Sequence, residues 1–590
     1  MIKLCTISVL SMFAFFFHIQ TQTLAKSTPV STSENILSVK VPIKASLKLS
    51  ETQAYFVSLK AGQIASVKIK QISVGVYYAV FDPKGSLMQI ADYNGINYSE
   101  RIIIEAATTG IFKIQVGWDY GEPKSGSYEI ILDKLERQAR TPTAKAEQLL
   151  NSWYDSQSPG SAVAVLKDNK VIFRSVKGLA IVEHNIPITN STVFDLASVS
   201  KQFTAFAIAI LVDKGLLALD DDIRKYLPEI PDFGKKITIR QLIDHTSGIR
   251  DWTYCFQLAG YQVEDVSTMG MILRFAANQK QLNFNPGDEF SYSNTGYNLL
   301  AVIVERVTKQ SFPTWTRENI FAPLGMKSTS FKEDYQDAIR HEAFSYASDG
   351  SPFKLKRGNM AAFGSSSLYS SIDDLIIWAN NFDNHLAGSE NVFRIINTLG
   401  VLNNGDKLSY AFGNDKTTYR KANVIQHLGL TLGYRTSIRR FPDQNLSVIY
   451  LANDGNDATY TRAEQIGDLF VKGLETLPPP TMPEFPKIDE SDTKIIETPE
   501  LVDYIGTYYS EELGTIYELK LTNGKLTAFH SRINPIAWTI SKSDTFFSDA
   551  TFMKKIEFVR DSKSELLGFK VSNASDRNIM FDRVKKNEKP

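Results

Sequence analysis

The sequence predicts a multidomain protein in which a central domain of mixed helices and strands (α/β, or α+β) lies between two domains built of β-strands. Three observations lead to this prediction. The chain has 590 residues, enough for about three or four domains of about 150 residues each. Apolar residues alternate with polar ones near both ends of the chain and have helical spacing in the middle. A proline-rich stretch separates the middle from the last part.

The composition excludes two broad classes of protein. Lys plus Arg and Asp plus Glu each number 65, so the formal net charge is zero and the chain lacks the excess of positive charge that attracts nucleic acid. Hydrophobic residues make up 43% of the chain, including 35 Phe and 25 Tyr, which is more buriable surface than a disordered protein carries. We therefore expect a folded protein with no nucleic-acid partner.

Residues 1–25 have the features of a secretory signal peptide. Lys3 is their only charged residue, an apolar run covers residues 4–17, and the segment ends in the small residue Ala25. The run is shorter than the roughly 20 apolar residues that span a bilayer. We expect a secreted or periplasmic protein with no transmembrane segment after cleavage. Its remaining cysteine, Cys255, is then expected to be a core or pocket thiol without a disulfide partner in the chain.

Residues 36–136 are predicted to form a β-sandwich. Apolar and polar residues alternate along residues 67–70 and 112–116, as in strands that bury one face. Turn residues such as Asn94-Gly95 separate these short segments, which is typical of sandwiches. The stretch 55–128 resembles the small β-sandwich modules appended to secreted bacterial peptidases, and this resemblance implies an accessory or binding role. A passive spacer is the alternative.

Two further segments follow the central domain, which we place at residues 145–475. Residues 477–498 are rich in proline and predict a stiff, extended linker, because each proline ring fixes φ and removes a backbone donor. Residues 499–587 return to short strands around the hairpin turn Asn523-Gly524, which predicts an up-and-down barrel of about eight strands. Their start, residues 504–509, resembles the lipocalin-like C-terminal domain that accompanies some D-aminopeptidase-type serine hydrolases.

Ser198 and Lys201 are the strongest candidates for chemistry in the central domain. They precede apolar positions with the spacing of a buried helical stripe, namely Phe203, Phe206, Ala207, Ile210 and Leu211. Such a helix would place Ser198 in its first turn with Lys201 on the same face. A buried lysine with a lowered pKa could accept the serine proton, and a helix start favours an oxyanion. The spacing alone is weak evidence, because it recurs, for example at Ser351 and Lys354.

Two short sequence motifs later in the chain, here called boxes, support a catalytic role for Ser198 and Lys201. Tyr292-Ser293-Asn294 stands just before the helical run 297–307, and His427-Leu428-Gly429 precedes the strand-like run 447–451. The three boxes in this order resemble the serine β-lactamase and penicillin-binding-protein superfamily. Phrases that match its branch of class C β-lactamases, D-aminopeptidases and esterases are LIDHTSG at 242–248, PLGM at 323–326 and SIDDL at 371–375. The resemblance covers about residues 147–474 and implies a β-lactamase/transpeptidase-like fold for the central domain.

The resemblance also implies a role for each residue. Ser198 would attack a carbonyl carbon and carry the acyl group. Lys201 and Tyr292 would share the proton transfers, and Asn294 would hydrogen-bond Lys201 or the substrate amide. The oxyanion hole would consist of the backbone N–H groups of Ser198 and Leu430. No cofactor and no metal are implied, and the sequence has no dense cluster of metal ligands.

The third box departs from the penicillin-recognising members of the superfamily. These usually have Lys-Thr-Gly, whose lysine is a permanent cation for the substrate carboxylate, whereas this chain has His427, which loses its charge above about pH 6.5. The departure weakens a β-lactamase interpretation and favours the D-aminopeptidase and esterase side. It also predicts a loss of rate as His427 titrates. Gly429 is expected to leave room for the substrate beside Leu430, on an edge strand.

Three other features leave alternatives open. His245 is expected to brace a loop by hydrogen bonds rather than to take part in chemistry. Residues 364–367 either line the cleft or form a tight turn. Trp252 and Tyr254 either form a substrate wall or belong to an aromatic core.

The sequence therefore predicts a secreted serine hydrolase that works through a Ser198 acyl-enzyme on small peptide, D-amino-acid amide or ester substrates. One alternative is a β-lactamase or a D-Ala-D-Ala carboxypeptidase acting on cell-wall peptides. The other is a non-catalytic ligand-binding protein on the same fold, although a binder has no need for both Lys201 and Tyr292. The sequence carries no signal for an oligomeric state.

Overall fold

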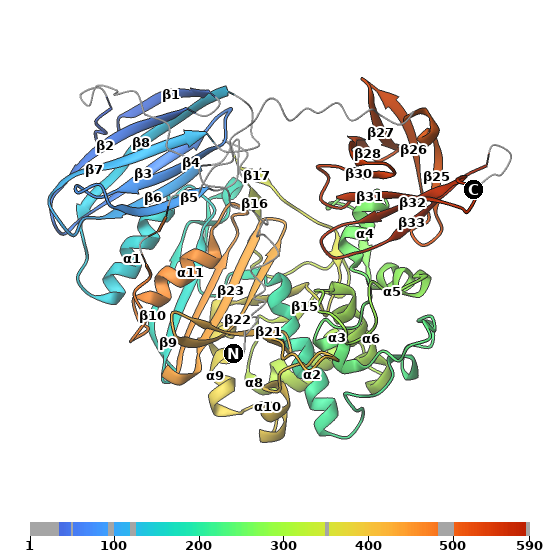
Figure 1. Ribbon diagram of the computed structural model, residues 1–590. Coiled ribbons are helices and arrows are strands. Elements are labelled where there is room, and N and C mark those ends of the chain that lie inside the picture. Colours follow the sequence, from blue (N-terminus) through green and yellow to red (C-terminus); the bar gives the residue numbers. More distant parts are fainter. Residues whose placement is uncertain are drawn as a thin grey trace.

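The computed structural model of the protein describes residues 35–48, 51–92, 99–118, 125–347, 353–478, 480–481 and 501–585. The predicted signal peptide, residues 1–25, lies outside these ranges, and so does most of the predicted linker, residues 477–498. Figure 1 shows a pair of sheets (blue), a central domain of helices and sheet, and a C-terminal barrel (red). The sheet pair and the barrel contact different sides of the central domain.

The N-terminal sheet pair consists of two four-stranded antiparallel sheets. One has the order β1 (Pro42–Lys48), β8 (Ser125–Arg137), β3 (Gln63–Gln71), β6 (Ser99–Glu105), and the other the order β2 (Thr52–Leu59), β7 (Gly110–Trp118), β4 (Val76–Phe81), β5 (Leu87–Asp92). The expected alternation is confirmed, because Val67 and Ile69 are buried in β3, and Phe112, Ile114 and Val116 are buried in β7. These side chains belong to one buried cluster to which both sheets contribute.

A seven-stranded antiparallel sheet forms the frame of the central domain. Its order is β10 (Lys170–Lys177), β9 (Ser161–Lys167), β24 (Leu446–Ala452), β23 (Tyr434–Phe441), β22 (Ala422–Thr431), β21 (Asn414–Tyr419), β20 (Tyr410–Ala411). Along β9 alternate side chains enter different cores. Val163 and Val165 pack with helices α1 (Pro142–Trp153) and α11 (Thr459–Asp468), whereas Ala162 and Ala164 face the helices that carry the site.

The helical half of the central domain is inserted between β10 and β20. Its helices are α2 (Ser200–Asp213), α3 (Ile239–Ile243), α4 (Trp252–Leu258), α5 (Met269–Asn278), α6 (Asn294–Thr308), α7 (Phe312–Thr316), α8 (Ala322–Leu324), α9 (Ile372–Asn384) and α10 (Glu390–Ile396), with the π-helical turn η5 (Arg317–Phe321). Short strands join its loops, namely β11 (Leu179–Ile181), β12 (Ile186–Pro187), β13 (Val193–Asp195), β14 (Ser267–Thr268), β15 (Ser330–Phe331), β16 (Tyr346–Ala347), β17 (Lys354–Leu355), β18 (Met360–Ala361) and β19 (Leu368–Ser371). The 3-10 turns of this half are η2 (Val182–His184), η3 (Ala197–Val199) and η4 (Ile223–Lys225). Two more lie elsewhere, η6 (Pro442–Gln444) between β23 and β24 and η7 (Leu501–Tyr504) before β25 (Gly506–Ser510). Within the described residues, no helix combines the length and apolar character needed to cross a bilayer.

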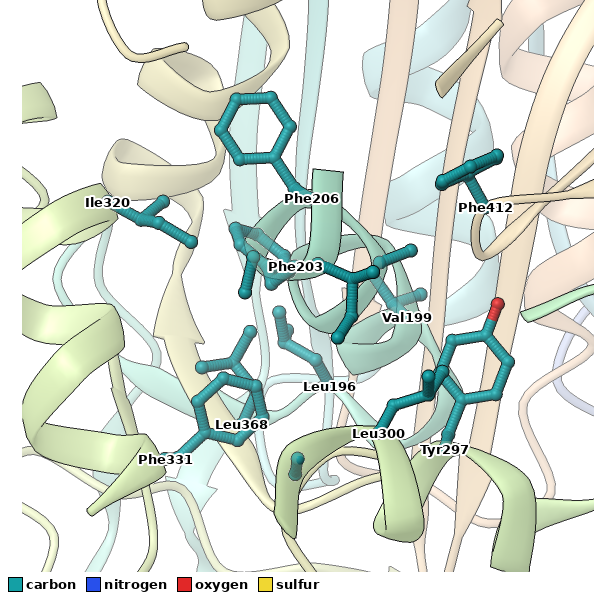
Figure 2. Packing of buried hydrophobic residues seen from close by; sticks show 14 of the residues in the cluster. Leu196, Val199, Phe203, Phe206, Tyr297, Leu300, Ile320, Phe331, Leu368 and Phe412 are labelled. Carbon is teal, nitrogen blue, oxygen red and sulfur yellow. The ribbon is translucent and has the colours of Figure 1, made fainter. Parts of the chain in front are cut away.

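Helix α2 lies at the centre of this half. The predicted apolar stripe is confirmed, but burial goes further, because every residue from Ser200 to Leu211 is buried. Figure 2 shows Val199, Phe203 and Phe206 among side chains from other elements, which are Leu196, Tyr297, Leu300, Ile320, Phe331, Leu368 and Phe412. A helix enclosed in this way has little freedom to shift, so the residues at its start are held by the core itself.

The C-terminal residues form one nine-stranded antiparallel sheet, against about eight strands expected from the sequence. Its order is β28 (Ile533–Ala537), β27 (Lys525–His530), β26 (Thr515–Thr522), β25 (Gly506–Ser510), β33 (Ile579–Arg583), β32 (Leu566–Ser572), β31 (Lys555–Arg560), β30 (Thr545–Phe547), β29 (Thr539–Lys542). The end strands β28 and β29 are separated in the chain only by Trp538, so the sheet curls into a nearly closed barrel. The predicted hairpin turn is confirmed, since Asn523 and Gly524 have φ of 50° and 75° and connect the paired residues Thr522 and Lys525.

Candidate active site

Ser198 lies in the turn η3, which leads directly into α2, and not in the α-helix itself as predicted. Ala197, immediately before it, has φ of 48°, a left-handed conformation that a residue with a side chain rarely adopts. The N–H of Ala197 donates to Asp195 Oδ1 at 2.8 Å and so stabilises the turn. Burial raises the pKa of Asp195 to about 7. The resulting bend leaves Ser198 partly exposed beside Lys201.

Lys201 is fully buried and contacts three groups. Its Nζ lies 3.1 Å from Ser198 Oγ, 2.8 Å from Asn294 Oδ1 and 2.8 Å from the carbonyl oxygen of Ser365. The last contact shows that the serine-rich segment 364–367 reaches the site through its backbone. Burial lowers the pKa of Lys201 to about 7, and the nearby carboxylate of Asp251 opposes part of that change. A substantial fraction of Lys201 is therefore a neutral amine at neutral pH.

Tyr292 and Asn294 enter the site from the start of α6, where Ser293 caps the helix through a hydrogen bond from the N–H of Gly296. The Tyr292 hydroxyl lies close to Ser198, and the Tyr292 ring centroid lies 4.8 Å from Lys201 Nζ. Burial raises the pKa of the Tyr292 hydroxyl above its ordinary value, so this group stays protonated at neutral pH. The structure thus brings Ser198, Lys201, Tyr292 and Asn294 together.

Asp251 is a site residue that the sequence analysis missed. Its Oδ2 accepts hydrogen bonds from the backbone N–H of Asn294 at 2.6 Å and from Asn294 Nδ2 at 2.9 Å. The carboxylate therefore orients the Asn294 amide so that its oxygen faces Lys201. An aspartate just before the helical run 252–258 is a recognisable N-cap signal, and Asp251 does cap α4 by accepting from the N–H of Thr253. Its contact with Asn294 has no such local signal.

His427 is buried in β22 next to Tyr410. The carbonyl oxygen of Leu428, 2.6 Å from Nδ1, only accepts hydrogen bonds, so Nδ1 carries the proton, and Nε2 then accepts from the Tyr410 hydroxyl at 3.0 Å. Burial, with a smaller effect of Lys201, lowers the pKa of His427 to about 3. The predicted loss of rate from His427 titration near pH 6.5 is therefore wrong, because the ring stays neutral down to a pH far below 6.5.

Gly429 and Leu430 follow on the same strand. A Cβ atom at Gly429 would lie 2.1 Å from the carbonyl oxygen of Leu196 and 2.1 Å from Thr436 Oγ1. The glycine is thus needed to let β22 pack against the turn that carries Ser198, and its expected role in leaving room for substrate stays a prediction.

The strand β22 is not an edge strand as predicted, because it lies between β23 and β21. Pairing with β21 covers only Ala422 to Gln426, so within the described residues the second half of β22 is open on that side. Two-residue hairpins close β22 at both ends, at the pairs Tyr419–Ala422 and Thr431–Tyr434. The closing pair of a two-residue hairpin is hydrogen-bonded, and every second residue pair along the strands is hydrogen-bonded in the same way. Counted from either hairpin, the N–H of Leu430 points away from β23 and toward the open side. This N–H is free to meet a ligand.

The remaining predictions concern packing. His245 Nδ1 accepts from the N–H of Ser293 at 3.0 Å, which confirms that His245 braces a loop, here the segment that carries Tyr292 and Asn294. Trp252 is buried and donates from Nε1 to Asn298 Oδ1 at 3.0 Å, so it belongs to the core.

The site combines a serine hydroxyl, an amine with a lowered pKa, a protonated phenol and an open strand N–H. This set of groups suits nucleophilic attack on a carbonyl carbon. Among the residues that the structure describes, no group of three or more His, Cys, Asp or Glu side chains is arranged to hold a metal ion.

Comparison with known proteins agrees with this chemistry. The family model described as Beta-lactamase matches residues 132–469, more than half of the chain. Penicillin-binding protein 4* of Bacillus subtilis (strain 168) is 29% identical over 387 residues, which are 62% of this chain and 82% of that protein. A D-aminopeptidase of Gluconobacter oxydans (strain 621H) is 29% identical over 307 residues, which are 52% of this chain and 58% of that protein. The chain therefore spans little more than half of the second relative.

A solved structure similar to the chain is the octameric penicillin-binding protein homologue from Pyrococcus abyssi. It superposes with a TM-score of 0.49 at 22% sequence identity, over 74% of this chain and 99% of that chain.

Proposed function

Because the chain belongs to the beta-lactamase family and is a serine hydrolase, we propose that it cleaves small amide, peptide or ester bonds through an acyl-enzyme on Ser198. The observation that carries this proposal is the 3.1 Å contact between Lys201 Nζ and Ser198 Oγ. Burial lowers the pKa of Lys201 to about 7, so the amine is available as a base at the pH where a serine hydroxyl needs one.

Acylation starts when neutral Lys201 accepts the proton of Ser198 while Oγ forms a bond with the substrate carbonyl carbon. The carbonyl π electrons move to oxygen and give an oxyanion. The backbone N–H groups of Ser198 and Leu430 are proposed to bind this oxyanion, and the open side of β22 supports the second assignment. Asn294, held by Asp251, keeps the Lys201 amine beside Oγ.

Collapse of the tetrahedral intermediate breaks the bond to the leaving amine or alcohol, which must gain a proton. Tyr292 lies close to Ser198 and next to Lys201, so it suits a relay in which it donates its proton to the leaving group and regains one from Lys201. In deacylation, water attacks the ester and gives its proton to Lys201. The Ser198–acyl bond then breaks, and Oγ recovers the proton.

The third box supports the choice of substrate class. The pKa of His427 is about 3, so this box supplies no cation for a substrate carboxylate at neutral pH. This favours amides and esters that lack such a carboxylate, including D-amino-acid amides, and the D-aminopeptidase relative supports that choice. A β-lactamase or D-Ala-D-Ala carboxypeptidase is the second candidate, favoured by the name of the Bacillus subtilis relative.

Location and accessory roles complete the proposal. The apolar run within residues 1–25 supports export, to the periplasm or the medium. We also propose that the N-terminal sheet pair is a β-sandwich accessory module and that the C-terminal barrel is lipocalin-like.

Hydrolysis of a matched panel tests the proposal. The panel holds D- and L-alanine p-nitroanilides, a p-nitrophenyl ester and a chromogenic cephalosporin. We expect turnover by the mature protein to disappear with Ser198→Ala and to persist with Ser351→Ala, which changes the serine of another Ser-x-x-Lys sequence. The preferred compound then separates aminopeptidase, esterase and β-lactamase.

Undiminished turnover in folded Ser198→Ala would overturn the acyl-enzyme. No turnover of any compound by the folded wild type would instead favour a ligand-binding protein.

A further inference from the structure

The C-terminal barrel shares its core with two helices of the central domain. Trp252, Phe256 and Leu258 of α4, and Ile272 and Phe275 of α5, belong to one buried cluster with barrel side chains that include Tyr517, Leu519, Trp538, Phe569 and Phe581. The Tyr517 hydroxyl also donates to the carbonyl oxygen of Leu258 at 3.0 Å. Cys255, buried as predicted, lies in the same cluster. The barrel therefore packs on α4 as part of the same core.

A polar contact joins the barrel to the two residues before α4. Asp576, in the loop between β32 and β33, accepts the backbone N–H of Asp251 at 2.8 Å through Oδ1. Arg250 is fully buried, lies 2.7 Å from the carboxylate of Glu512 and donates to the carbonyl oxygen of Arg577. Both Asp251 and Asp576 are buried, so neither group has water as an alternative partner.

Asn283 fixes the loop on its other side. Its Nδ2 donates to the carbonyl oxygen of Ser575 at 2.9 Å, and its Oδ1 accepts the N–H of Arg577 at 2.9 Å. The guanidinium of Arg577 makes a bidentate pair with Glu289 at 3.0 and 2.8 Å. The loop is thus held in one position against the central domain.

Asp251 connects this loop to the site. Its backbone N–H goes to Asp576, while its carboxylate holds Asn294 at two points, 2.6 and 2.9 Å, and Asn294 holds Lys201 at 2.8 Å. We propose that Asp576 is a positioning residue which the C-terminal barrel contributes to the active site: it fixes Asp251 and thereby holds Asn294 and Lys201 in place beside Ser198. This inference rests on the proposed function, because it assigns Asp576 a part in the same reaction.

The physical reason is that removal of Asp576 leaves a buried N–H without an acceptor. The segment at Asp251 would then move to find another partner or admit water, and Asn294 would move with it. Burial, and less strongly the charge of Asp251, raise the pKa of Asp576 to about 7, so a large fraction of its carboxyl groups is neutral near neutral pH. An asparagine at this position keeps both the shape and the accepting oxygen.

Three variants of the full chain test the inference. Asp576→Ala removes the acceptor, and Asp576→Asn retains it. Arg532→Ala is the matched control, because Arg532 pairs with Asp265 across the same junction at 2.8 and 2.6 Å and, within the described residues, forms no hydrogen bond or ion pair with Asp251 or Asn294. For each variant we measure kcat and KM on the best panel compound. We also measure the pH profile of kcat/KM and thermal unfolding.

We expect Asp576→Ala to lower kcat at least tenfold with KM changed less than twofold. The acidic limb of the kcat/KM profile of this variant should move to higher pH, since water near Lys201 weakens the burial that lowers the pKa of Lys201. Asp576→Asn should stay within threefold of wild type, and Arg532→Ala within twofold without a change in the limb. If the alanine variant does not fold, Asp576→Ser takes its place, because its short side chain does not reach the N–H of Asp251.

Equal kcat and equal pH profiles for Asp576→Ala and Arg532→Ala would overturn the inference, as would a loss in Asp576→Asn as large as in Asp576→Ala. Ser198→Ala, measured alongside, separates this failure from a failure of the proposed function. Full turnover in Ser198→Ala refutes the acyl-enzyme itself. An inactive Ser198→Ala with an unaffected Asp576→Ala refutes only the role of Asp576.

Discussion

The two flanking regions meet the central domain in opposite ways. The barrel shares a buried core with α4 and α5. The N-terminal sheet pair keeps its own buried cluster, and a cleft of about 510 Å³ lies between it and the central domain. Charged side chains from both sides line this cleft, including Lys68, Arg101, Asp155 and Asp454.

Polar contacts join the sheet pair to the central domain, beside the apolar contact of Ile103 in β6 with the buried cluster around α1. Arg101 of β6 pairs with Asp155 of the central domain at 2.6 Å, and Gln148 of α1 donates to the carbonyl oxygen of Arg137 at 2.8 Å. A polar contact with one exposed partner, such as Asp155, stabilises a junction only weakly, whereas a shared apolar core makes two domains unfold together. The comparison indicates that the barrel is a structural part of the catalytic unit and that the sheet pair is an attachment to it.

Removal of a large side chain from the barrel junction should have the largest effect. Phe256 is buried among Trp252, Tyr261 and Phe275, with ring centroids 5.0 to 5.9 Å away. Phe256→Ala should lower the free energy of unfolding by about 3–5 kcal/mol. Calorimetry should show that the barrel and the central domain lose stability in the same transition. Ile114→Ala, in the N-terminal cluster, should destabilise only the sheet pair. If Ile114→Ala also lowered the unfolding temperature of the central domain, the two junctions would not differ in the way described.

Asp251→Ala should have the next largest effect, and it acts on the rate. The variant removes both hydrogen bonds that orient Asn294, and we expect kcat to fall by about 100-fold, comparable to the loss of one preorganised polar group in a hydrolase site. Asp265→Ala removes a carboxylate from the same junction without a contact to Asn294, and it should retain more than half of wild-type kcat. Similar losses in the two variants would mean that the junction acts only through stability.

Lowering the pH below about 7 should reduce kcat/KM by up to about tenfold per pH unit. Acylation needs neutral Lys201, whose pKa is about 7, so kcat/KM should rise with pH up to about 7 and level off above it. His427→Gln should leave the midpoint in place, because the pKa of His427 is about 3 and its charge is absent throughout. If the midpoint of the pH profile moved in His427→Gln, the titration of His427 would contribute to the rate after all.

Asp155→Ala should have the smallest effect. The Asp155 side chain is 52% exposed, and Arg101, which is only 9% exposed, keeps a second carboxylate partner in Asp133 at 2.8 Å. The loss of Asp155 should therefore cost less than about 1 kcal/mol of unfolding free energy. Hydrolysis of every panel compound should remain within twofold of wild type. A larger fall in kcat would show that the N-terminal junction also supports the site.

Features that depend on neighbours in the chain could be predicted from the sequence. The Ser198–Lys201 spacing, the apolar stripe of α2 and the Asn523-Gly524 hairpin all arise within one or two turns of backbone. The central fold followed from three boxes that resemble a known superfamily, which the family model now supports. Ser198 itself falls just before the α-helix, since the left-handed Ala197 bends the chain there.

Features that depend on tertiary contacts could not be predicted. Asp251 lies 43 residues from Asn294 and 325 residues from Asp576, so no local pattern links them. Ser365 contributes a backbone carbonyl oxygen, which every residue type has. The expected titration of His427 was wrong because its burial is set by the aromatic side chains around it and not by the sequence of its box.

The pairing of β9 with β24 has a consequence for the order in which the protein folds. Ser161 pairs with Ala452 and Lys167 with Leu446, so nearly the whole central domain must be synthesised before its sheet can close. Contacts between such distant segments form late and slowly. A growing chain therefore carries Ser198 and Lys201 long before it has β22 beside them. Hydrolytic activity should consequently appear only after the last strands of the sheet have joined the first, which keeps an incomplete chain from acylating itself or its neighbours.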